Sequence, residues 1–128
     1  MIEILFRGQT VDGCWVYGFY CLNQKDGKVH EILEDNTGGY VVNPDTVGQF
    51  TGLLDKNGKL IFEGDVVEYS GTHHEVVFET CSGSAFFGIA FRDRGETWLF
   101  GRQTPASHME VFGNIHDNPE LLGKEDVE

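Results

Sequence analysis

The sequence predicts a mainly β protein, with a small SH3-like barrel in its second half, an N-terminal β-meander and a short C-terminal helical turn. Short runs of aromatic and β-branched residues alternate with turn residues at spacings of roughly 8–12 residues, which is typical of sandwiches and barrels. Seventeen glycines among 128 residues suit frequent tight turns. The 3.6-residue apolar period that marks an amphipathic helix is almost absent.

The first part of the chain is predicted to form strands joined by tight turns. Residues 2–6 alternate apolar and polar side chains, the two-residue period of a half-buried strand. Asp26-Gly27 is a hairpin signal, and Pro44 suits the first position of a single helical turn at 44–46. The expected strands of this meander are residues 2–6, 15–22, 29–33 and 40–42.

Residues 47–67 are the most informative segment, because two turns and two strands follow one another in fixed order. Asn57-Gly58 is a strong turn signal, since both residues tolerate positive φ. Gly64-Asp65 closes a second turn before a β-branched pair, and the strands that follow resemble the opening of an SH3-like barrel. The expected strands of the second half are residues 66–69, 75–80, 85–91, 97–100 and 109–115.

A short helix is expected near the end of the chain. Asp117 or Asn118 can serve as its N-cap, and Pro119 suits its first helical position. The following residues are charged and are expected to fray. The predicted organisation is one domain over residues 1–122, with the meander of residues 1–46 packed on the barrel of residues 47–122, and a charged tail at residues 123–128.

Three blocks of the chain, residues 3–7, 47–67 and 110–122, resemble the YopX family of small phage and prophage proteins. They stand in the family's order, and the central block contains its Asp-Lys-Asn-Gly and Glu-Gly-Asp turns. The resemblance implies a phage or prophage context and a β-rich, YopX-like domain. It implies no catalytic residues.

The charge balance bears on the kind of partner. The chain has 21 acidic and nine basic residues, a formal net charge of −12. Nucleic-acid binding depends on Lys and Arg that neutralise phosphates, and only Arg92, Arg94 and Arg102 are close enough to form a patch. Nucleic acid is therefore not an expected partner, whereas acidic groups would steer a basic protein surface toward the chain.

The sequence predicts a protein of the host-cell cytoplasm. No apolar run approaches the roughly 20 residues of a transmembrane helix, and no signal peptide opens the chain. The cysteines, Cys14, Cys21 and Cys81, are odd in number and contain no C-x-x-C pair. Reduced thiols are the economical interpretation, and no membrane association is expected.

The sequence predicts no catalytic, metal or cofactor site. His73-His74 would point to opposite faces of a strand, so the two cannot bind one metal ion from regular β structure. No nucleophile elbow, P-loop or dinucleotide fingerprint occurs. The chain is therefore predicted to be non-enzymatic and to carry no cofactor.

Two groups of residues in the central block are assigned different roles. Asx-type bonding and positive φ explain the structural turn residues, and the remaining polar side chains are candidates for contact with a partner. The structural turns are assigned to Asp55, Asn57, Gly58, Gly64 and Asp65, and the partner contacts to Gln49, Thr51 and Glu63.

The predicted function is that of a phage- or prophage-encoded accessory protein acting through protein–protein contacts. Self-association is also expected, because a cluster of aromatic residues loads both faces of one strand. One alternative is a nucleic-acid-associated barrel, which Lys and Arg gathered on one face would support. Another is a small enzyme with an unrecognised cleft, which convergent polar groups would support. The aromatic cluster is Trp15, Tyr17, Phe19 and Tyr20.

Overall fold

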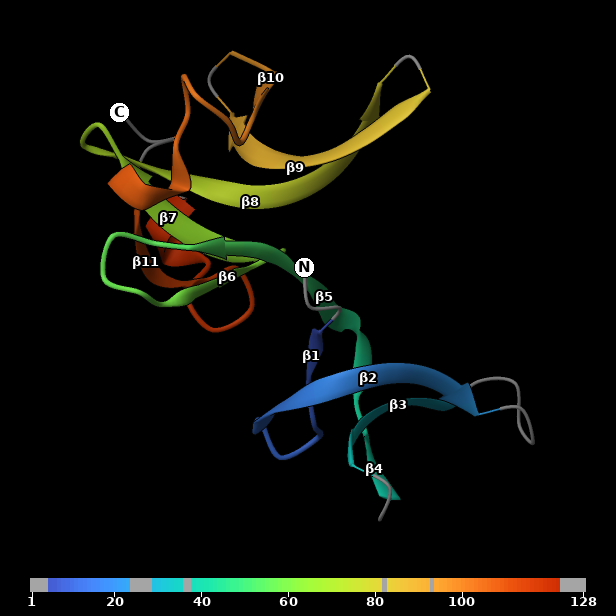
Figure 1. Ribbon diagram of the computed structural model, residues 1–128. Helices are drawn as coiled ribbons and strands as arrows, with labels where there is room; N and C mark the ends of the chain where they lie inside the picture. Colours follow the sequence, from blue (N-terminus) through green and yellow to red (C-terminus); the bar gives the residue numbers. More distant parts are fainter. Residues whose placement is uncertain (1–4, 24–28, 36–37, 82, 93, 123–128) are drawn as a thin grey trace. The chain divides into compact units, whose positions relative to one another are not determined.

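The computed structural model of the protein confirms the mainly β class (Figure 1). The chain forms two compact units, Met1–Gly52 and Leu53–Glu128, and the strand β5 (Asn43–Leu54) runs from the first into the second. Within the described residues no helix has the length and apolar character needed to cross a membrane. The structure describes residues 5–23, 29–35, 38–81, 83–92 and 94–122.

The first unit is built on successive antiparallel hairpins. Its strands are β1 (Phe6–Gln9), β2 (Trp15–Asn23), β3 (Val29–Asp35), β4 (Gly38–Val41) and most of β5. Each of β1 to β4 pairs with the next, as expected for a meander, and β5 returns to lie beside β1. The strand expected at residues 2–6 falls largely outside the described residues, and the hairpin turn expected at residues 25–28 falls wholly outside them.

The helical turn predicted at residues 44–46 is wrong, because this segment is a bulge within β5. Arg7 pairs with Gly48 and Gln9 with Asn43, so β5 has several more residues than β1 between these two pairs. The Thr46 hydroxyl accepts a hydrogen bond from the Gln9 N–H at 2.8 Å and donates to the Asn43 carbonyl at 2.6 Å. These bonds satisfy the backbone without a helix.

The second unit forms an antiparallel sheet that is not closed. Among the described residues its strand order is β10-β9-β8-β7-β11, while β6 neighbours β5. Because β10 and β11 stand at opposite ends of this order, the sheet is open where the sequence predicted a barrel. The elements are β6 (Leu60–Phe62), β7 (Asp65–Tyr69), β8 (Thr72–Cys81), β9 (Ser84–Phe91), β10 (Glu96–Leu99), the 3-10 helix η1 (Ala106–His108) and β11 (Glu110–Asn114).

The chain turns after β11 into the short helix that the sequence predicts, of which residues 120–122 are described. The Asn118 side chain accepts a hydrogen bond from the Asn114 N–H at 3.2 Å, and the Asn114 side chain accepts one from the His116 N–H at 2.9 Å. Leu122 is buried. These side-chain bonds fix the turn that carries the chain out of the sheet.

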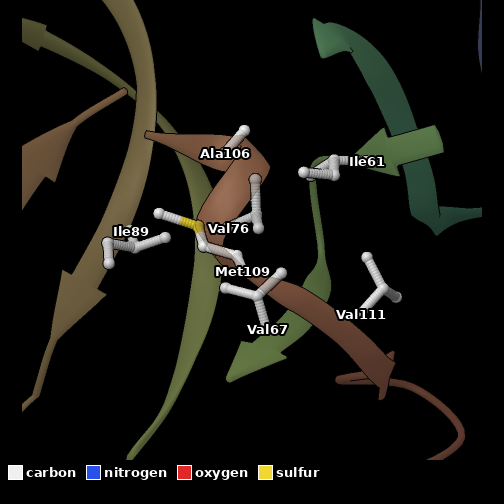
Figure 2. Packing of buried hydrophobic residues seen from close by; sticks show 7 residues of the cluster. All are labelled: Ile61, Val67, Val76, Ile89, Ala106, Met109 and Val111. Carbon is white, nitrogen blue, oxygen red and sulfur yellow. The ribbon is translucent and has the colours of Figure 1, made fainter. Parts of the chain in front are cut away.

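Each unit has its own buried cluster. In the first unit Val16, Ile32 and Val42 are buried, with Phe6 and Val47 packed against them. Figure 2 shows the larger cluster of the second unit, in which Met109 lies among side chains from several strands. The first cluster is small for a unit so rich in aromatic residues. The second cluster comprises Ile61, Val67, Val76, Ile89, Ala106, Met109 and Val111.

Candidate protein-interaction surface

The carboxylate of the buried Asp55 accepts three backbone hydrogen bonds. Its Oδ1 accepts from the Asn57 N–H at 2.8 Å and the Lys59 N–H at 2.9 Å, which shapes the turn before β6. Its Oδ2 accepts from the Val111 N–H at 2.9 Å and so attaches this turn to β11. The Asp55 carboxylate therefore holds together two segments that are far apart in the sequence.

The other turn residues of the central block also serve the backbone. Asp65 is buried, and its Oδ2 accepts a hydrogen bond from the Phe62 N–H at 2.8 Å. Gly58 and Gly64 have φ of 81° and 93°, the left-handed region that favours glycine. These residues lie in the two turns or directly beside them, and their hydrogen bonds and backbone conformations shape the chain itself.

The residues assigned to partner contact are divided between the units and differ in exposure. Gln49 is half-buried opposite Phe6, and Thr51 is only 8% exposed. Glu63 belongs to the second unit and is half-buried. Thr51 offers little surface to a partner, while Gln49 and Glu63 remain partly accessible.

Glu63 influences a second carboxylate, that of Glu75 on β8. Burial raises the pKa of Glu75, the charge of Arg92 opposes this, and the negative charge of Glu63 raises it further, so the net shift is upward. Because the folded-state pKa of Glu75 is raised, keeping Glu75 ionised lowers the stability of the folded protein above that pKa. This loss of stability disappears below the ordinary value of 4.5, where Glu75 is protonated in both states.

We therefore expect Glu75→Gln to increase the free energy of unfolding at neutral pH. The gain should vanish as the pH falls below 4.5, where Glu75 is protonated in both states. Urea unfolding across this pH range measures the change. Glu120→Gln, at an exposed position, is the control for loss of a carboxylate and should change the free energy of unfolding little at neutral pH. A loss of stability in Glu75→Gln at neutral pH would contradict the expectation.

The two adjacent histidines have separate environments. His74 is buried, with its ring centroid 4.2 Å from that of Phe91 and its Nε2 2.6 Å from the Thr72 hydroxyl. His73 packs its ring 5.0 Å from that of Phe112. Among the described residues, no group of three or more His, Cys, Asp or Glu side chains is arranged to hold a metal ion.

An exposed apolar surface of the first unit lies on β2, β3 and β4. Phe19 pairs with Leu33 across β2 and β3, and Tyr17 precedes Phe19 by two residues, so all three share one face of the sheet. Val41 pairs with Glu31, two residues before Leu33, and therefore lies on the same face. We call Tyr17, Phe19, Leu33 and Val41 the apolar face.

The apolar face is open to solvent. Phe19 is 64% exposed, Val41 60% and Tyr17 44%. The neighbouring Trp15 is half-buried, because the guanidinium of Arg7 lies 4.8 Å from its ring centroid. The aromatic cluster noted in the sequence is thus divided, with Tyr17 and Phe19 exposed and Trp15 packed beside a buried cation.

Tyr20 occupies the opposite face of the same strand. Its ring lies 5.7 Å from Phe6, which packs on the buried cluster of the first unit, and it stacks on His30. β2 therefore carries large side chains on both faces, as expected. Which of those side chains are exposed depends on packing in the folded chain and cannot be read from the alternation in the sequence.

The chain is similar to known proteins over almost its whole length. The family model described as "YopX protein" matches residues 6–123. The crystal structure of protein EF1440 from Enterococcus faecalis is 23% identical, covers 95% of this chain and 99% of that chain, and superposes with a TM-score of 0.56. At this identity the likeness shows the fold alone. The search of curated proteins found no match.

Proposed function

The chain belongs to the YopX family, and we propose that it is a phage- or prophage-encoded accessory protein that binds a protein partner and catalyses no reaction. The apolar face is the observation that carries this proposal. Phe19 and Val41 are each more than half exposed and lie on one face of a sheet. An exposed set of aromatic and aliphatic side chains is the usual centre of a protein interface.

The partner is proposed to be basic. The chain has a net charge of −12, and Asp12, Glu34 and Asp45 are exposed in the first unit. Arg7, by contrast, is buried beside Trp15, which removes its guanidinium from the surface. Exposed carboxylates accelerate encounter with a cationic surface and make association sensitive to salt.

The proposed place of action is the cytoplasm of the host cell. Cys14 and Cys21 are exposed free thiols. Exposed free thiols persist in a compartment that keeps cysteines reduced. This agrees with the phage context that membership of the YopX family suggests.

Phe19→Ser is expected to abolish capture of the partner. The immobilised full chain, incubated with bacterial lysate, should retain a protein that Phe19→Ser loses by at least about tenfold, since central aromatic residues dominate interface energetics. Val11→Ser is the matched control, because Val11 is 98% exposed but lies outside the apolar face. Retention should fall as salt concentration rises.

Two results would contradict the proposal. Equal capture by wild type and by Phe19→Ser would remove the apolar face from the interaction, and capture insensitive to salt would remove its electrostatic part. Sedimentation of the purified chain tests self-association. If a dimer forms and Phe19→Ser dissociates it while Val11→Ser does not, the apolar face binds a second copy in place of a basic partner.

A further inference from the structure

An open groove borders the outer edge of the second unit's sheet. The strand β10 ends the strand order and pairs, among the described residues, with β9 alone. The groove has a volume of about 500 Å³, within the range of sites that bind ligands. Its lining residues are Thr97, Trp98 and Leu99 from β10, and Gly101, Arg102, Gln103 and Thr104 from the loop that follows.

The backbone of β10 has hydrogen-bonding groups on the side away from β9. The Phe100 N–H donates to the Phe87 carbonyl at 3.1 Å, which fixes the phase of the antiparallel ladder with β9. Because inward and outward groups alternate along such a ladder, the N–H and C=O groups of Thr97 and Leu99 point away from β9. These two residues present the donors and acceptors with which another strand could pair.

The loop that completes the lining of the groove is held in place. The Tyr69 hydroxyl donates a hydrogen bond to the Gln103 carbonyl at 3.1 Å, and the Gly101 N–H donates to the Thr104 carbonyl at 3.2 Å. Thr104 is buried, which anchors the end of the loop. The groove is therefore a feature of the folded unit that exists before any ligand binds.

Apolar side chains and cations meet at this groove. Leu99 is 55% exposed and Trp98 36%. The guanidinium of Arg94 lies 5.7 Å from the Trp98 ring centroid, and Arg102 lines the groove itself. With the exposed Arg92, three of the nine basic residues of an acidic chain lie in this short segment.

The nearby carboxylates are engaged in local hydrogen bonds. A Glu96 oxygen accepts a hydrogen bond from the Trp98 indole N–H at 3.1 Å, and a Glu79 oxygen accepts one from the Thr97 hydroxyl at 3.3 Å. Both carboxylates keep their charge, so the cationic character of this region depends on Arg102, which lines the groove, and on Arg94, which lies over the Trp98 ring. The charge of these two arginines favours an anionic ligand.

We propose that the edge of β10 binds an extended acidic peptide segment of a partner protein, which adds to the sheet as a further strand. Main-chain hydrogen bonds to Thr97 and Leu99 would provide affinity that is independent of sequence. Alternate side chains of the peptide would select for sequence, with an apolar residue against Trp98 and a carboxylate against Arg102. This surface is distinct in chemistry from the apolar face, which is proposed to take a basic partner.

The test uses a short fluorescein-labelled peptide that alternates valine and glutamate, titrated into the full chain. We expect binding that Arg102→Glu weakens by at least about tenfold, because the variant places a carboxylate against the peptide's own. Lys56→Glu is the matched control for charge, since Lys56 is exposed and does not line the groove. Phe19→Ser should leave peptide binding unchanged, which separates this site from the apolar face.

A second measurement does not depend on any variant of the protein. Peptide binding should protect the Thr97 and Leu99 amides from hydrogen exchange, and a peptide N-methylated at every residue, which blocks both of its edges, should lose affinity. Equal affinity of the methylated peptide, equal affinity of Arg102→Glu, or no binding at all would overturn the proposal. Tighter binding of a valine–lysine peptide or of single-stranded DNA would overturn the choice of an acidic peptide.

Discussion

Asp55→Asn is expected to lower the free energy of unfolding of the second unit by about 2–4 kcal/mol, because a buried carboxylate that accepts three backbone hydrogen bonds is replaced by an amide. The amide keeps one acceptor oxygen and turns an NH₂ group toward a backbone N–H. Val111 or the pair Asn57 and Lys59 then loses its acceptor. A buried N–H without an acceptor is costly.

Tryptophan fluorescence can follow the second unit alone. The chain has two tryptophans, Trp15 in the first unit and Trp98 in the second. In a Trp15→Phe background, the fluorescence of Trp98 follows urea unfolding of the second unit. Asp12→Asn, at an exposed carboxylate of the first unit, is the control and should change little. Equal stability of Asp55→Asn and Asp12→Asn would show that the Asp55 hydrogen bonds contribute nothing net.

The effect of Asp55→Asn on stability should also depend on pH. Burial raises the pKa of Asp55, but three backbone hydrogen bonds, that of Val111 foremost, and the charge of Lys59 together lower it below the ordinary value of 3.8. The contribution of ionised Asp55 is therefore complete above 3.8 and is lost as the pH falls through the lower, folded-state pKa. The stability difference between wild type and Asp55→Asn should be constant near neutral pH and shrink in acid.

Gly88→Ala is expected to lower the free energy of unfolding by about 2–3 kcal/mol, because there is no space for a methyl group at this position of β9. A Cβ on Gly88 would lie 2.5 Å from the Trp98 carbonyl oxygen and 2.9 Å from the Leu99 Cα. Both are backbone atoms of β10, so the clash is relieved only by separating β10 from β9. Loss of this pairing would also remove one wall of the groove.

Two readouts distinguish this effect from general destabilisation. Separation of β10 should shift the emission of Trp98 to longer wavelength before global unfolding, and it should weaken binding of the valine–glutamate peptide. Gly101→Ala is the matched control for stability and for Trp98 emission, because the nearest atom to its Cβ would be the Leu99 side chain at an ordinary 3.7 Å. Because Gly101 lines the groove, this variant does not serve as a control for peptide binding. Unchanged stability and emission in Gly88→Ala would contradict the close approach of the two strands.

The strands of the second half show which elements the local sequence pattern predicts. The runs expected at residues 75–80 and 85–91 lie within β8 and β9, because alternating apolar residues and flanking turns are properties of adjacent positions. At residues 44–46 the local pattern predicts the wrong structure. Pro44 is compatible with a helical start, but the hydrogen bond from Gln9 to Thr46 joins residues that are far apart in the sequence and keeps the segment extended.

The mainly β class, the family and the turn formed by residues 55–58 follow from the sequence, because turn chemistry acts between near neighbours. Three features follow only from the folded chain: Asp55 also holds β11, the sheet stays open at β10, and particular aromatic side chains of β2 face solvent. Each of these outcomes depends on which strands pair and in what register. Pairing is settled by contacts between distant segments, and a single strand does not specify its neighbour.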